Sequence, residues 1–142
     1  MKKRLIAILI VLTMAVCVFP VCASADNNSV MANTPVLEGN QYRILINGAK
    51  YLVPVGTLLS YGSQGREVGI AQMKLNELDS DLRIGCNAGT ADNIFGRKTE
   101  AAVWSFQSWF CDNRSIFNGD PIGIDGIVGE ETWSVFSKIE IL

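Results

Sequence analysis

The sequence has 142 residues, with 12 Lys and Arg against 14 Asp and Glu, and it contains no His. This length suits a single domain, and the charge balance shows no basic patch of the kind that nucleic-acid binders carry. The absence of His excludes Ser-His and Cys-His hydrolase centres and His-ligated zinc sites.

The first 25 residues have the pattern of a secretory signal peptide. Basic residues at positions 2–4 precede an apolar stretch at 5–18, and small residues at 23 and 25 fit a cleavage site. A retained membrane anchor is the alternative, but the apolar stretch is short for a span. We therefore expect a mature chain from Asp26 without a membrane span. Removing three basic residues leaves nine against 14 acidic ones, a net charge of about −5.

Two cysteines remain in this mature chain, Cys86 and Cys111. In an exported protein an even number of cysteines favours a disulfide. Two buried free thiols are the alternative.

Residues 26–40 are polar and predict a flexible leader. Residues 41–56 predict a β-hairpin, because two β-prone segments flank Asn47-Gly48, the strongest two-residue hairpin signal. Tyr42, Ile44 and Ile46 share one face of it. An isolated hairpin is marginally stable in water, so we expect it to pack on the following domain or on a partner.

A helix is expected to begin near residue 66 or 67. Apolar residues then recur at a spacing of three and four, which lays one stripe along a helix: Val68, Ala71, Leu75, Leu78 and Leu82. Lys74 and Glu77 lie off this stripe, so the pattern predicts that they face water.

One pattern, D-x-I-x-G-x-x-T, occurs at residues 92–99 and again at 125–132. Each copy leads into an apolar stretch that predicts a helix, at about 97–112 and 130–138. Two copies of a loop and helix predict a small domain built by internal duplication.

We interpret the motif as a folding device. Its Asp should accept backbone N–H groups of its own loop, its Gly should give backbone freedom before the helix, and its Thr should bond or pack in the first helical turn. Ile94 and Ile127 are expected to point into the core. The positions concerned are Asp92, Gly96, Thr99, Asp125, Gly129 and Thr132.

The functional alternative is that the two motif Asp residues bind a metal ion. Calcium loops need several oxygen ligands at alternating positions, and neither copy supplies them. We therefore predict no metal and no cofactor.

Residues 57–138 resemble the bacterial peptidoglycan-binding domain of the three-helix type, which is found appended to cell-wall hydrolases. Two departures stand out: Asn93 replaces the usual Gly after the first motif Asp, and both loops between helices are longer than usual. Asn tolerates a positive φ better than most residues. Three ordered blocks carry the resemblance: Gly62-Ser63-Gln64-Gly65 with Val68, Gln72 and Leu75; Asp92, Ile94-Phe95-Gly96, Thr99, Ala102-Val103 and Phe106-Gln107; and Asp125-Gly126-Ile127-Val128-Gly129 with Thr132-Trp133.

The resemblance implies a mainly α fold, a small three-helix orthogonal bundle with a duplicated loop-helix unit at 57–140, preceded by the short β-hairpin. It implies an exported, non-catalytic protein of the bacterial cell wall that binds peptidoglycan through the stem peptide and nearby sugar. A disulfide between Cys86 and Cys111 would then connect the two long loops.

Five residues are candidate ligand contacts: Tyr61, Arg97, Trp104, Gln107 and Arg114. Exposed aromatic rings can stack on sugar faces, and Arg can bind a stem-peptide carboxylate. Ordinary surface packing is the alternative for Tyr61, Trp104 and the two Arg. Gln107, like Gln72, is equally suited to a hydrogen bond between helices.

Two other functions remain as alternatives. The hairpin and domain could dock on a partner such as a cell-wall hydrolase. A small glycosidase could use two carboxylates such as Glu67, Glu100 or Glu130, but these lie on predicted outward helix faces with no sign of a cleft.

Overall fold

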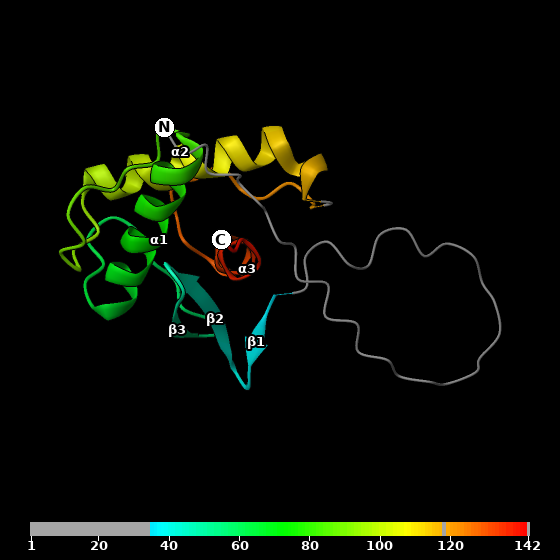
Figure 1. The fold of residues 1–142 in the computed structure, drawn as a ribbon. Coiled ribbons are helices and arrows are strands. Elements are labelled where there is room, and N and C mark those ends of the chain that lie inside the picture. The colour runs from blue at the N-terminus through cyan, green and yellow to red at the C-terminus, as the bar shows by residue number, and fades with distance from the viewer. Residues whose placement is uncertain (1–34, 118, 142) are drawn as a thin grey trace, which may run out of the picture.

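The computed structural model describes residues 35–117 and 119–141. The predicted signal peptide and most of the predicted leader lie outside these residues. A small three-stranded antiparallel sheet precedes three helices, so the described part of the chain is mainly α, as expected (Figure 1). No helix among the described residues is long and apolar enough to cross a membrane.

The sheet consists of β1 (Leu37–Glu38), β2 (Gln41–Ile46) and β3 (Ala49–Pro54), in the order β1-β2-β3. Asn47 and Gly48 have φ of 49° and 79°, as the two positions of a type I′ turn require. This confirms the hairpin. The predicted flexible leader extended to residue 40, which was wrong for its last residues. Leu37 and Glu38 form β1, a third strand that pairs with β2.

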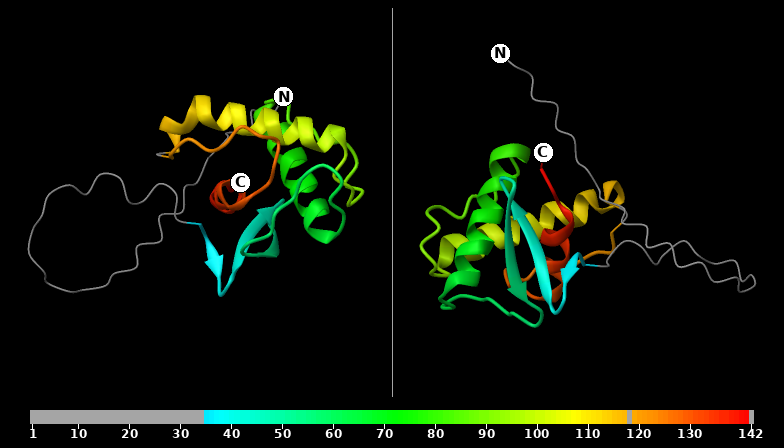
Figure 2. Two further views of the ribbon diagram at one scale, coloured as in Figure 1. Left: turned by 180° about the vertical axis from the view of Figure 1, so that it is seen from behind. Right: turned by 60° about the horizontal axis from the view of Figure 1, so that its bottom comes forward.

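The inner face of the sheet belongs to the same core as the helices. Tyr42, Ile44 and Ile46 are buried there, and the ring of Tyr42 stacks on that of Trp133 with centroids 6.5 Å apart. β2 contacts both α3 (Glu130–Lys138) and α1 (Arg66–Leu82). Figure 2 shows α3 between the sheet and α2 from the opposite side as well.

α1 (Arg66–Leu82) begins where predicted, and α2 (Arg97–Asn113) and α3 (Glu130–Lys138) begin and end within a residue of the predicted positions. A 3-10 turn, η1 (Arg114–Ile116), follows α2. Phe106 of α2 meets Phe136 of α3 with ring centroids 4.9 Å apart, and Trp109 is half-buried at the edge of this cluster. The spacing in α1 correctly predicted four buried side chains, but Leu82 is only half-buried and Ile70, which lies off the stripe, is buried. The four are Val68, Ala71, Leu75 and Leu78. The buried apolar side chains of α2 are Ala102, Val103, Phe106 and Phe110.

Lys74 and Glu77 do not face water, contrary to the prediction. Lys74 is 0% exposed, and its Nζ lies 2.7 Å from Glu77 Oε2. The ammonium also donates to the carbonyls of Leu45 (2.8 Å) and Ile139 (2.7 Å). Glu77 in turn accepts the N–H of Asn47 at 2.6 Å. The hairpin and the C-terminal segment cover this second side of α1, so the ion pair connects three separate parts of the chain.

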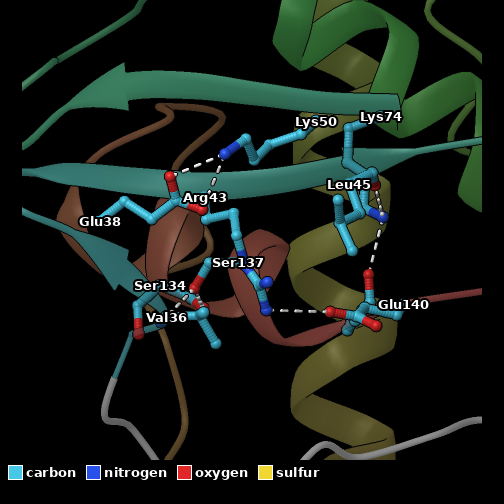
Figure 3. Close-up of polar contacts among 10 residues, drawn as sticks. Val36, Glu38, Arg43, Leu45, Lys50, Lys74, Ser134, Ser137 and Glu140 are labelled. Atoms are coloured by element: carbon cyan, nitrogen blue, oxygen red, sulfur yellow. Dashed lines mark hydrogen bonds and ion pairs between the residues drawn. The ribbon is translucent and has the colours of Figure 1, made fainter. Parts of the chain in front are cut away.

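The other ion pairs of the sheet are more exposed and weaker. Figure 3 shows Arg43 of β2 reaching Glu140 after α3, at 3.4 Å, and Lys50 of β3 reaching Glu38 of β1, at 2.9 Å. The N–H of Val36 donates to the Ser137 hydroxyl at 3.0 Å. The Val36 and Arg43 contacts connect the sheet to α3 and the residue that follows Ile139, whereas the Lys50–Glu38 pair lies within the sheet.

The predicted disulfide was wrong, because Cys86 and Cys111 are both free. Each thiol instead donates to a nearby carbonyl: Cys86 to Leu75 (3.2 Å) and Cys111 to Ile122 (3.3 Å). Burial raises the pKa of the Cys86 thiol to about 12. Cys86 therefore packs its loop against α1, and Cys111 of α2 contacts the loop that follows this helix.

We expect Lys74→Ala to lower the free energy of unfolding by about 3–5 kcal/mol, because it leaves the Glu77 carboxylate buried without its cation. Urea denaturation measures this. The double variant Lys74→Met with Glu77→Gln should recover much of the loss, since it removes the buried charge. Lys98→Ala, at an exposed lysine of α2, is the control. If the Lys74→Ala protein is as stable as this control, the buried ion pair does not stabilise the fold.

Candidate functional site

The loop that leads into α2 is held by one buried side chain of α1. Gln72 is 1% exposed, and its Nε2 donates to Asp92 Oδ1 (2.9 Å), the Ile94 carbonyl (3.0 Å) and Thr99 Oγ1 (3.0 Å). Its Oε1 accepts the N–H of Asn93 at 3.1 Å. One amide side chain thus fixes the first copy of the motif from Asp to Thr.

The loop that leads into α3 is held in the same way by Gln107 of α2. Its Nε2 donates to Asp125 Oδ1 (3.0 Å), the Ile127 carbonyl (2.9 Å) and Thr132 Oγ1 (3.1 Å). Its Oε1 accepts the N–H groups of Asp125 (3.0 Å) and Gly126 (2.9 Å). Gln107 is 1% exposed, so of its two predicted roles the structure shows the hydrogen bond between helix and loop.

The motif Asp residues behave as predicted. Asp92 Oδ1 accepts the N–H of Ile94 at 3.0 Å, and Asp125 Oδ1 accepts that of Ile127 at 2.9 Å. These are Asx turns. The hydrogen bond from Gln72, followed by that from the Ile94 N–H, holds the pKa of Asp92 below its usual value. The carboxylate is therefore a fixed acceptor within its own loop.

The backbone freedom in the motif lies at a different position from the one predicted. Gly96 and Gly129 have φ of −93° and −104°, which any residue adopts. The left-handed position is the one after the Asp, with φ of 63° at Asn93 and 74° at Gly126. Asn93 therefore does adopt the conformation that Gly has in the second copy.

The motif Ile residues do not fill the core as expected. Ile94 is 49% exposed, whereas its neighbour Phe95 is 0% exposed. Likewise Ile127 is half-buried and Val128 is fully buried. Each motif forms an isolated antiparallel bridge at this point, and in such extended backbone successive side chains point to opposite sides.

Three of the predicted contact residues share one exposed surface, which we name the aromatic face: Tyr61, Arg97 and Trp104. Tyr61 is 57% exposed and Trp104 is 54% exposed. The Arg97 guanidinium lies 5.6 Å from the centroid of the Tyr61 ring, a cation–π contact. Arg97 and Trp104 are seven residues apart on α2, which places them on one side of the helix and about 10 Å apart along its axis.

The structure does not bring the other two candidates to this surface. Arg114 is exposed at the far end of α2, 17 residues after Arg97 and about 25 Å along the helix axis. Gln107 is buried. Ile94 was missed as a surface residue, although its exposed side chain lies three residues before α2. An apolar residue in a loop gives no sequence signal of exposure.

No group of three or more Cys, Asp or Glu side chains in residues 35–117 and 119–141 is placed to hold a metal ion. The carboxylates of Asp92 and Asp125 are engaged with Gln72 and Gln107. The aromatic face instead offers two aromatic rings and one cation for contacts with a sugar or a carboxylate.

We expect Gln72→Leu and Gln107→Leu each to lower the free energy of unfolding by about 2–4 kcal/mol, because each leaves several buried and partly buried donors and acceptors without their partner. Urea denaturation measures the effect, with Gln64→Leu at an exposed loop residue as the matched control. Equal stability of all three variants would show that the two buried amides do not hold the loops.

Comparison with known protein families gives a match to part of the chain. Residues 64–111 match the family model described as "Putative peptidoglycan binding domain". No curated protein and no solved structure matches the chain. The matched segment runs from the loop before α1 through most of α2, and it includes Gln72, the first motif copy, Arg97 and Trp104. The match confirms the resemblance of residues 64–111 to a peptidoglycan-binding domain.

Proposed function

We propose that this is an exported, non-catalytic protein of the bacterial cell wall that binds peptidoglycan through the aromatic face. The main support for the proposal is that the segment matched by the family model includes part of that face. Residues 64–111 include Arg97 and Trp104, and Trp104 is a large aromatic side chain left 54% exposed on α2.

The chemistry of the face suits a polymer of sugars and short peptides. The exposed indole of Trp104 can lie against the apolar face of a sugar ring. The Arg97 guanidinium can form two parallel hydrogen bonds with a stem-peptide carboxylate, and the Tyr61 ring beside it restricts its position. The expected net charge of the mature chain is negative, so these direct contacts, rather than long-range attraction, must supply the affinity.

The arrangement of carboxylates supports a non-catalytic role. The sequence has no His, and Glu67, Glu100 and Glu130 lie in the first turns of three different helices. Glu130 does line a groove with Glu131. However, the Glu131 carboxylate accepts the N–H of Gly123 at 2.9 Å, a contact that holds the preceding loop.

A sedimentation assay with purified insoluble peptidoglycan at physiological salt tests the proposal. The wild-type protein should sediment with the polymer. Trp104→Ala and Arg97→Ala should each weaken binding by about tenfold or more, as expected for a central aromatic or Arg contact. Leu37→Ala is the matched control, because Leu37 is also exposed but lies in β1, across the molecule from α2 (Figure 1).

Wild-type protein that stays in the supernatant would contradict peptidoglycan binding. If the Trp104, Arg97 and Leu37 variants bind equally well, the binding site does not lie on the aromatic face. Loss of turbidity of the same polymer suspension on adding the protein would instead support the glycosidase alternative.

A further inference from the structure

β3 is an edge strand of the sheet, and some of its backbone groups point away from β2. On β2, the N–H of Arg43 donates to Val36 on the β1 side, and the carbonyl of Leu45 accepts from Lys74. These β2 groups therefore point away from β3. Arg43 pairs with Leu52 and Leu45 with Lys50, and in such antiparallel pairs the backbone groups of both residues point outward. The N–H and C=O groups of Lys50 and Leu52 thus form the free edge.

Near Pro54 the backbone groups of this edge have partners or are missing, whereas near Lys50 they are unpaired among the described residues. Arg66 donates to the Leu52 carbonyl at 3.2 Å, and Pro54 has no N–H while its carbonyl accepts from Thr57. Within the part of the chain that the structure describes, the N–H and C=O of Lys50 and the N–H of Leu52 have no hydrogen-bond partner. Such unpaired groups can bind another strand.

A groove of about 470 Å³ lies beside this edge, between the sheet and α1. Tyr51 lines it from β3, and Met73, Asn76, Ser80 and Asp81 line it from α1. Tyr51 pairs with Ile44, whose side chain is buried on the inner face of the sheet. Because side chains alternate along a strand, a segment added to β3 would place every second side chain over this groove.

The groove carries a negative charge. Its Glu77 is neutralised by Lys74 at 2.7 Å, which leaves the Asp81 carboxylate. The nearest cation on β3, Lys50, is on the other face of the sheet, where it pairs with Glu38 at 2.9 Å. A basic side chain entering from outside would complement Asp81.

We propose that the β3 edge binds one extended segment of another protein, which adds a fourth strand and places a Lys or Arg side chain beside Asp81. This mode combines backbone hydrogen bonds for affinity with side-chain pockets for specificity. A second copy of this chain fits less well in the same place. The inward-facing residues of its β3 are Ala49, Tyr51 and Val53, none of which is basic.

The surface is separate from the aromatic face, so the proposal stands independently of peptidoglycan binding. The described protein could hold the wall polymer along α2 and a protein partner along β3 at the same time. A cell-wall hydrolase with a basic extended segment is a partner of this kind.

Backbone-amide NMR of the full mature chain tests the proposal with the peptide acetyl-Thr-Val-Lys-Val-Lys-Val-Thr-amide as the probe. Titration to about 1 mM should reveal weak binding, with shift changes gathered at Lys50, Leu52, Asn76 and Ser80. Asp81→Asn should weaken binding about fivefold, since it removes the complementary charge. Asp112→Asn, the same change at an exposed residue of α2, should leave it unchanged.

Two further comparisons separate strand addition from simple charge attraction. The same peptide with Glu in place of Lys should bind at least about fivefold more weakly. A Lys peptide N-methylated at alternate amides keeps its charge but loses the edge hydrogen bonds, so it should not bind. Leu52→Pro should also abolish binding while amide shifts elsewhere stay as in the wild type, because an edge strand tolerates Pro.

Several outcomes would overturn the proposal. These are no shift changes with the Lys peptide, shift changes gathered at Tyr61 and Trp104 instead, or equal binding by the N-methylated peptide. Concentration-dependent changes at β3 without any peptide would show that a second copy occupies the edge.

Discussion

Two buried glutamine side chains determine how the helices of this protein are joined. Gln72 on α1 holds the loop before α2, and Gln107 on α2 holds the loop before α3, each through hydrogen bonds to a motif Asp, a backbone carbonyl and a motif Thr. Backbone hydrogen bonds also hold each loop, between Ser63 and Phe95 in the first and between Leu59 and Val128 in the second, and the glutamine side chains add the contacts that connect each loop to the preceding helix. Because each amide is buried, losing it leaves several polar groups unpaired. The aromatic face depends on the first of these networks, which fixes the start of α2 and with it Arg97 and Trp104.

Elements of the fold could be predicted where a short sequence pattern strongly favours one local conformation. Asn47-Gly48 predicted the hairpin, and the two motif copies predicted the starts of α2 and α3. The sequence could not reveal β1, because a strand of two residues has no periodicity to detect. It also could not reveal that Lys74 is buried. A Lys three residues before a Glu is typical of a solvated helix face, and only the tertiary packing of the sheet and C-terminal segment encloses the pair.

The site was partly predictable for the same reason. Trp104 was a candidate for an exposed aromatic ring, and it is exposed in the structure, because it lies about a hundred degrees from the apolar side of α2. The contact of Arg97 with Tyr61 joins two elements 36 residues apart, which spacing cannot show. Cys86 and Cys111 illustrate the opposite error. An even number of cysteines in a chain with a predicted export signal favoured a disulfide. Pairing requires close Cβ positions, and each thiol instead contacts a nearby carbonyl.

In the proposed function, Trp104 and Arg97 on α2 contact the polymer. NMR titration of the mature protein with a soluble disaccharide-peptide fragment of peptidoglycan tests it most directly, because it reports every surface at once. The largest shift changes should occur at the Trp104 indole N–H and at the backbone amides around Arg97. Largest changes at the sheet or around Arg114, or none at a fragment concentration of about 1 mM, would contradict it.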